Sequence, residues 1–155
     1  MTEKTNVMRI LEQKKVTYKS YFYQSEQALS GVEVAALLEQ NPRQVFKTLV
    51  TVGKSNRNYV FVIPVEGELD LKKAAKAVGE KSIVMIKEKE LLPLTGYVHG
   101  GCSPIGMKKF FPTVIHKTAQ EFETIFFSAG KIGCQVEVSL EGLSQIICYS
   151  IGDLI

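Results

Sequence analysis

Two adjacent β-forming segments constrain the fold of this chain more than any other feature. The segments VFKTLVTV (45–52) and YVFVIPV (59–65) are rich in β-branched and aromatic residues, and the polar sequence GKSNRN lies between them. Two such segments around a glycine-containing turn predict an antiparallel hairpin. A sheet that contains this hairpin is not purely parallel.

Helical and strand-like segments alternate around the hairpin. Strands are predicted at 16–23, 82–86, 113–116, 124–130 and 134–140, and helices at 5–13, 30–40, 70–79, 87–92 and 139–148. Ser30 with Glu33 has the capping-box pattern, and Asp70 and Gly79 are suited to begin and end the helix between them. The interleaved order predicts an α/β fold with a mixed sheet. We expect residues 1–155 to form a single domain, since no linker or repeat interrupts them.

Composition excludes several classes of protein. With 45% hydrophobic and 23% charged residues the chain is expected to be globular, and no apolar run is long enough to span a bilayer. It is therefore expected to work in the cytoplasm, away from membranes. The net charge of +3 does not demand nucleic acid but allows a small basic patch. The three cysteines include no CxxC pair, which argues against a zinc site or disulfides, and Cys134 and Cys148 are expected in the core.

The stretch GYVHGGCSPIGMKKFFP (96–112) combines glycines and prolines with two lysines. It is not a phosphate-binding P-loop, because Met107 and Lys108 stand where that motif needs lysine and then serine or threonine. No GxGxxG fingerprint is present either. Gly100 and Gly101 could direct backbone N–H groups at a substrate oxygen, as in an oxyanion hole. An ordinary surface turn with a basic edge remains the alternative.

Single residues elsewhere leave two interpretations open. Lys47 is a cation within a β-forming apolar segment, so its ammonium either reaches solvent or enters a pocket. Ser128, in FFSAGK, could bind a ligand or cap the end of a strand. His99 and Cys102 lie in the glycine-rich stretch, where a catalytic role is conceivable, whereas His116 is expected at a surface strand end.

Four segments taken together are similar to a known family. VFKTLV (45–50), LDLKKAAKAVG (69–79), TGYVHGGCSPIGMKK (95–109) and ETIFFSAGK (123–131) closely resemble the YbaK/EbsC family of aminoacyl-tRNA deacylases in order and spacing. The resemblance covers residues 5 to 150. It implies one compact α/β domain with a curved, barrel-like mixed sheet and flanking helices. It also implies hydrolysis of mischarged aminoacyl-tRNA, typically Cys-tRNA(Pro), acting in trans and with the substrate's own thiol as the nucleophile.

The resemblance also implies roles for particular residues. Lys47 would orient the substrate and stabilise charge, Gly101 would donate to the carbonyl oxygen, and Ser128 would shape the pocket. The substrate would further be bound by the residues Tyr23 (or, as a weaker match, Tyr21), Gly100, Ser103, Pro104 and Lys108. No metal or cofactor is expected, because the substrate brings its own nucleophile.

The chain departs from the family pattern at two places. Ser30-Gly31 stands where many members have an aromatic residue before the glycine, and GKIGCQ (130–135) replaces a basic residue with Ile132. These changes bear on substrate choice and tRNA contact more than on the fold. The alternatives are a deacylase with a shifted substrate such as Ala-tRNA(Pro), and a non-catalytic regulatory protein, since a regulatory role is attached to the EbsC name. The expected partners are the acceptor end of tRNA and prolyl-tRNA synthetase, and the expected oligomeric state is a monomer or weak homodimer.

Overall fold

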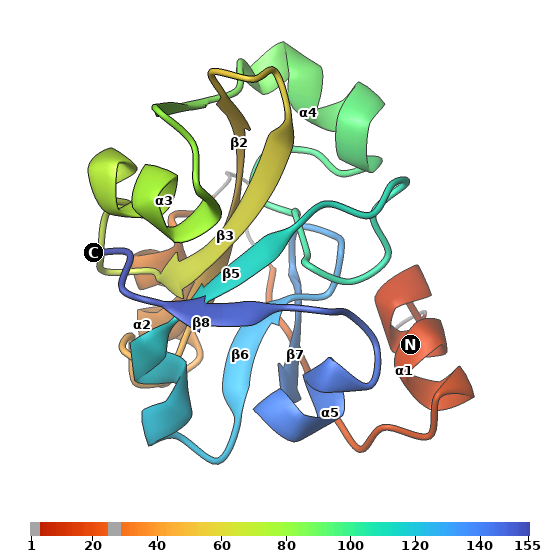
Figure 1. Cartoon of the computed structure of the whole chain (residues 1–155). Helices are drawn as coiled ribbons and strands as arrows, with labels where there is room; N and C mark the ends of the chain where they lie inside the picture. The colour runs from red at the N-terminus through yellow and green to blue at the C-terminus, as the bar shows by residue number, and fades with distance from the viewer. Residues whose placement is uncertain (1–3, 25–28) are drawn as a thin grey trace.

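The computed structural model describes residues 4–24 and 29–155 (Figure 1). The described helices are α1 Asn6–Gln13, α2 Gly31–Leu37, α3 Leu71–Val78, α4 Glu88–Thr95, α5 Leu140–Ser144 and the 3-10 helix η1 Lys117–Glu121. The described strands are β1 Lys19–Phe22, β2 Phe46–Gly53, β3 Asn58–Pro64, β4 Ile83–Met85, β5 Thr113–His116, β6 Ile125–Ser128, β7 Cys134–Val138 and β8 Ser150–Gly152. None of these helices is long and apolar enough to cross a bilayer.

Helix boundaries follow the local signals in the sequence. The predicted capping box at α2 is present, because Ser30 Oγ accepts the N–H of Glu33 while the Glu33 carboxylate accepts the N–H of Ser30. Asp70 accepts the first free N–H groups of α3, and Gly79 ends that helix with a φ of 74°. A left-handed φ of this kind strains any residue with a Cβ, so glycine is favoured there.

The strands form two sheets. Five strands make a mixed sheet in the order β4-β2-β3-β5-β8, in which β2 pairs antiparallel with β3 and with β4, and β5 pairs parallel with β3 and β8. Three strands make an antiparallel sheet in the order β1-β7-β6. The predicted hairpin and mixed sheet are thus confirmed. The barrel-like curvature is not, because within the described ranges the sheets meet at an isolated bridge between Val45 and Phe126 and no closed ring of strands forms.

The main core lies between the two sheets. Val60 and Val62 of β3 pack in it together with Phe127 of β6 and Val136 of β7, and α1 adds apolar side chains at one side. The alternate residues of β3, Phe61 and Ile63, pack on the opposite face against α3. Burial on both faces explains why β3 is a continuous apolar run rather than an alternating one.

The structure corrects four predictions away from the site. The segment 82–86 is not a buried strand, because β4 lies at a sheet edge with Val84 and Met85 exposed. The closing helix ends early, since α5 is followed by the edge strand β8. Cys148 is exposed. His116 is buried, and its Nδ1 accepts the N–H of Leu154 at 3.0 Å.

Candidate functional site

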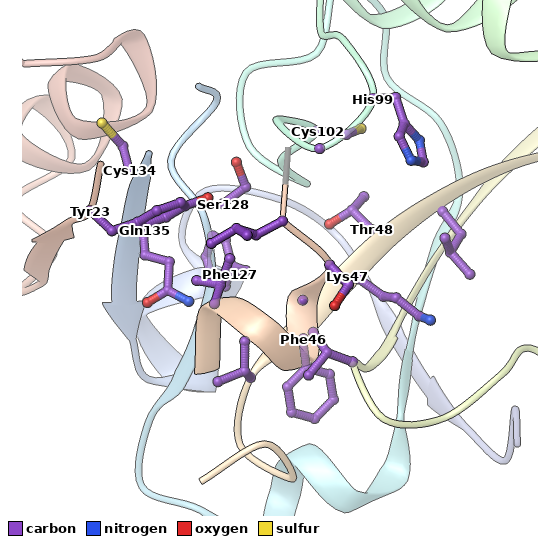
Figure 2. A pocket seen from close by; sticks show the side chains of 18 of the residues that line it. Tyr23, Phe46, Lys47, Thr48, His99, Cys102, Phe127, Ser128, Cys134 and Gln135 are labelled. Carbon is purple, nitrogen blue, oxygen red and sulfur yellow. The ribbon is translucent and has the colours of Figure 1, made fainter. Parts of the chain in front are cut away.

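A cavity of about 340 Å³ opens where the two sheets meet (Figure 2). Its wall combines the first half of β2, the facing ends of β6 and β7, the beginning of α2, Tyr23 after β1, and the loop after α4. The volume lies at the lower end of the usual range for small-molecule sites. None of the described residues that line it carries a carboxylate.

Lys47 brings a positive charge to this wall. It is half-buried on β2 opposite Ile63 of β3, and its ammonium takes part in no ion pair or hydrogen bond among the described residues. In Figure 2 its side chain extends away from Ser128 and Gln135. The ammonium is therefore uncommitted, and the flexible stem allows it to turn toward a bound anion.

The next residue, Thr48, also lines the cavity. Its Oγ1 is buried and has no hydrogen-bond partner. A buried hydroxyl without a partner is costly for a folded protein, and such groups call for an explanation. Thr48 was not predicted as a site residue from the sequence, although Thr48 follows Lys47 directly in the FKT segment.

The other wall is formed by paired residues of β6 and β7. Ser128 and Gln135 are opposite each other in the antiparallel register, and both line the cavity. The Ser128 Oγ accepts the N–H of Gly130 at 3.1 Å, so its hydroxyl hydrogen remains available to a ligand. Gln135 is 4% exposed, and its Oε1 accepts an N–H from the Gln40 side chain at 2.8 Å. Sequence reasoning noted this position only as part of a family departure.

The glycine-rich loop contributes only its first part to the cavity. His99, Gly100 and Cys102 line it, and Gly100 has a φ of 88°. Gly101 is buried beside them, but its N–H donates to the Val98 carbonyl at 3.0 Å and so is already used. The N–H groups of Gly100 and Cys102 donate no backbone hydrogen bond to any described residue.

Close packing favours glycine at position 101. A Cβ there would lie 3.2 Å from the backbone N of Ile132 and 3.3 Å from the carbonyl carbon of Lys131. These contacts involve backbone atoms, which do not move aside easily. The loop therefore packs closely against the turn that joins β6 to β7. This contact helps to position the neighbouring residues Gly100 and Cys102.

Three of the proposed binding residues lie outside the cavity wall. Ser103 is fully buried, and its Oγ accepts the N–H of Ile105 at 3.3 Å, which is a loop-stabilising role. Pro104 borders a second hollow, together with later residues of the same loop. Lys108 is exposed, and its stem passes over Gly96 at the end of α4. The structure thus brings Tyr23, Lys47, Gly100 and Ser128 together but does not place these three with them.

The two tyrosines near the end of β1 have different surroundings. Tyr23 lines the cavity, and its N–H donates to the Gly133 carbonyl at 2.9 Å. Tyr21 instead donates its hydroxyl to Glu137 at 2.6 Å, and this bond, together with burial, raises the pKa of Tyr21 to about 12. Of the two matches considered, Tyr23 is therefore the one in reach of a bound ligand.

The cavity cysteines are poor nucleophiles. Burial raises the pKa of the Cys102 thiol to about 12, and burial also raises the pKa of the Cys134 thiol. Since the thiolate is the reactive form, both residues stay protonated and unreactive at neutral pH. Within the described ranges, no three His, Cys, Asp or Glu side chains gather as a metal site. The thiols of Cys102 and Cys134 are therefore not expected to act as nucleophiles.

Comparisons with known proteins identify the family of this chain. The family model described as "Aminoacyl-tRNA editing domain" matches residues 25–146. The chain is 51% identical over 145 residues to an Enterococcus faecalis protein named "Putative Cys-tRNA(Pro)/Cys-tRNA(Cys) deacylase EbsC". That alignment covers 93% of this chain and 88% of the relative.

Solved structures share the fold at lower identity. A crystal structure of a hypothetical protein superposes with a TM-score of 0.86 at 21% identity, covering 96% of this chain and 97% of that one. A structure titled as a "putative trans-editing enzyme for prolyl tRNA synthetase" gives a TM-score of 0.81 at 22% identity, covering 96% and 93%. At these identities the likeness shows the fold alone.

Proposed function

The chain belongs to the aminoacyl-tRNA editing domain family, and from that premise we propose that it removes cysteine from mischarged tRNA(Pro) in trans. Its activity is that of an aminoacyl-tRNA deacylase. The choice of cysteine and of tRNA(Pro) is supported by the name of the Enterococcus faecalis relative, which shares half of its residues with this chain.

One observation carries the proposal. The cavity offers an uncommitted Lys47 ammonium and free N–H groups from the glycine loop, with no carboxylate among its described lining residues. Such a site attracts the negative charge that develops on an ester during cleavage. Among the described lining residues, the Cys102 thiol is not an activated nucleophile, because burial keeps it protonated. A substrate that supplies its own nucleophile fits both properties.

The cysteinyl ester provides that nucleophile. Its thiolate attacks the ester carbonyl, a sulfur–carbon bond forms and the carbon–oxygen bond to the ribose breaks. The ribose oxygen takes up the proton that the thiol released, and water then opens the cyclic thioester. In this scheme Lys47 favours the thiolate and the anionic carbonyl oxygen, the N–H groups of Gly100 and Cys102 bind that oxygen, and Ser128 and Tyr23 position the aminoacyl group.

The proposal modifies the expected role of one glycine. Gly101 was expected to donate to the carbonyl oxygen, but its N–H is already bonded to Val98. We assign the donor role to its two neighbours and a packing role to Gly101, which sets the loop against residues 131–132.

The direct test is deacylation by purified protein of Cys-tRNA(Pro), Ala-tRNA(Pro) and Pro-tRNA(Pro). We expect loss of cysteine only, because alanine and proline esters lack the thiol. Lys47→Ala is expected to lower kcat by about a hundredfold or more, as removal of a charge-stabilising group does in other sites. Lys54→Ala, in the exposed turn of the β2–β3 hairpin, is the matched control and is expected to match the wild type.

Two outcomes would overturn the assignment. Equal loss of alanine and cysteine would show that the substrate thiol is not used. A fully active Lys47→Ala protein would remove lysine from the mechanism while leaving the fold and family unchanged.

We further propose the setting in which this activity operates. Residues 1–155 would act as one editing domain in the cytoplasm, as a monomer or weak homodimer, on the acceptor end of tRNA that prolyl-tRNA synthetase has mischarged. Sedimentation of the protein with and without the synthetase and tRNA measures both the oligomeric state and the association.

A further inference from the structure

A second hollow borders the later part of the glycine-rich loop. Its volume is about 160 Å³, and it is bordered by Pro104, Met107, Lys109, Phe110 and Phe111, with Thr113 and Ile147 completing the rim. This is smaller than the usual small-molecule site, so it does not enclose a whole substrate. It can hold one flat group laid against an aromatic ring.

Phe110 is the most unusual residue of this hollow. Its side chain is 68% exposed, more than any other large apolar side chain in the described part of the chain. The adjoining aromatic residue, Phe111, is by contrast packed against the main core. The Phe110 ring therefore contributes little to the fold and has a free face.

Two lysines precede this ring. Lys108 and Lys109 are both exposed, and neither forms an ion pair with any described residue. An exposed aromatic ring beside uncommitted cations is the combination with which proteins bind single-stranded nucleic acid, the ring stacking on a base and the cations neutralising phosphates.

The hollow is close to the substrate cavity. Cys102 lines the cavity and Pro104 borders the hollow, so two residues of one loop connect the two places. Two residues span at most about 7 Å, which is roughly two nucleotide steps along a stacked strand. A strand whose terminal nucleotide enters the cavity can therefore reach the hollow with one of its next few nucleotides.

We propose that Phe110 stacks on an unpaired base of the substrate's single-stranded 3′ end, next to the terminal nucleotide, while Lys109 contacts the phosphate beside it. The inference rests on the proposed function, because that function places the 3′-terminal nucleotide of the substrate in the cavity. It adds a binding site that is separate from the cavity. This site binds a base of the tRNA by stacking and does not contact the amino acid.

The first experiment measures binding without chemistry. The probe is a fluorescent four-nucleotide RNA ending in CCA, titrated by anisotropy against the full chain. Phe110→Ala is expected to weaken binding about tenfold, the cost of losing one stacked base, and Phe110→Trp to restore it. Lys109→Ala is expected to lower the slope of log affinity against log salt by about 0.7. Val84→Ala, at the exposed edge strand β4, is the control and should change nothing.

The second experiment uses turnover. On mischarged tRNA, Phe110→Ala should raise KM about tenfold with little change in kcat. The preference for tRNA over a cysteinyl ester of adenosine, taken as the ratio of the two kcat/KM values, should fall by the same factor.

The results separate this site from the proposed function. Weaker RNA binding by Phe110→Ala, in a protein that deacylates none of the three tRNAs, would support the stacking site and refute the function. Active deacylation with RNA affinity and KM unchanged by Phe110→Ala would refute the stacking site and leave the function standing. If Phe110→Ala weakened only the association with a protein such as the synthetase, and not RNA binding, the stacking site would also be refuted.

Discussion

The Cys102 thiol lies in the candidate site but is not expected to act as a nucleophile. It lies on the cavity wall beside the glycine loop, yet burial raises its pKa to about 12. A thiol in that state is protonated across the physiological range and is a weak nucleophile. Its place on the wall is therefore explained by packing and by the backbone N–H that it carries.

Cys102→Ser should therefore retain activity within about twofold on Cys-tRNA(Pro), because no step uses the protein thiol. The kcat/KM of the purified variant is the measurement, and alkylation of the wild type with iodoacetamide at pH 7 should be slow. A loss of a hundredfold with the fold intact would assign Cys102 a chemical role.

Thr48 is a second residue of the cavity wall, and its unpaired hydroxyl suggests a functional role. Its buried hydroxyl without a partner lowers the stability of the folded chain. Thr48→Val keeps the shape and removes this group, so the free energy of unfolding in urea should rise by about 1 kcal/mol. We expect kcat/KM to fall in the same variant, since Thr48 lines the cavity. A variant that is more stable and equally active would show that the hydroxyl serves no function.

At the scale of elements, the loop after α4 is held rigidly from several sides. The Tyr97 hydroxyl, which is buried, donates to the Ile105 carbonyl, and the Gly101 N–H donates to Val98. Residues 131–132 press on the loop from the β6–β7 turn. Preorganised N–H groups cost no reorganisation during a reaction, so this rigidity suits a site for a developing oxyanion.

A matched pair of glycines tests the loop. Gly100 and Gly79 have left-handed φ values of 88° and 74°, and a Cβ at either position meets no backbone atom within 4 Å. Alanine at each position should cost about 1–2 kcal/mol of unfolding free energy through backbone strain. Only Gly100→Ala should also lower deacylation, by about tenfold or more, because Gly79 ends α3 away from the cavity. Equal activities of the two variants would remove Gly100 from the site.

At the scale of the whole molecule, Asp153 and Leu154 connect α3 to the five-stranded sheet. The Leu154 N–H donates to His116 on β5, the Leu154 carbonyl accepts the N–H of Asp70 at 2.7 Å, and Lys73 of α3 pairs with Asp153 at 3.2 Å. Burial lowers the pKa of His116 below its usual 6.5; Lys117 and Lys73 act in the same direction, and Asp153 and Glu121 oppose it.

This His116 shift predicts the pH dependence of stability. Because the folded pKa is lower than the unfolded value, the unfolded chain takes up the proton first. The stabilisation is complete above about pH 6.5 and is lost as the pH falls through the lowered folded pKa. Urea unfolding between pH 5.5 and 7.5 should show this loss in the wild type, whereas His116→Asn, which cannot titrate, should give a flatter curve. Identical curves would place the proton uptake elsewhere.

The sequence by itself determined much of the local structure and identified four residues of the cavity wall. The caps at Ser30 and Asp70, the stop at Gly79 and the hairpin all follow from contacts within a few residues, so they could be predicted. Lys47, Ser128, Tyr23 and Gly100 were identified because the four motifs match a family as an ordered set. All four line the cavity.

Only the tertiary structure decided the remaining features, because they depend on contacts between distant segments. His116 was expected on the surface at the end of a strand; it does end β5, but β8 and the segment after β8 bury its side chain. A single curved sheet was expected, but the strands form two sheets. The N–H of Gly101 was a plausible donor in the sequence, but the folded loop commits it to Val98. Burial of the Thr48 hydroxyl and of Gln135 likewise arises where β2, β6 and β7 converge, and no local pattern records that convergence.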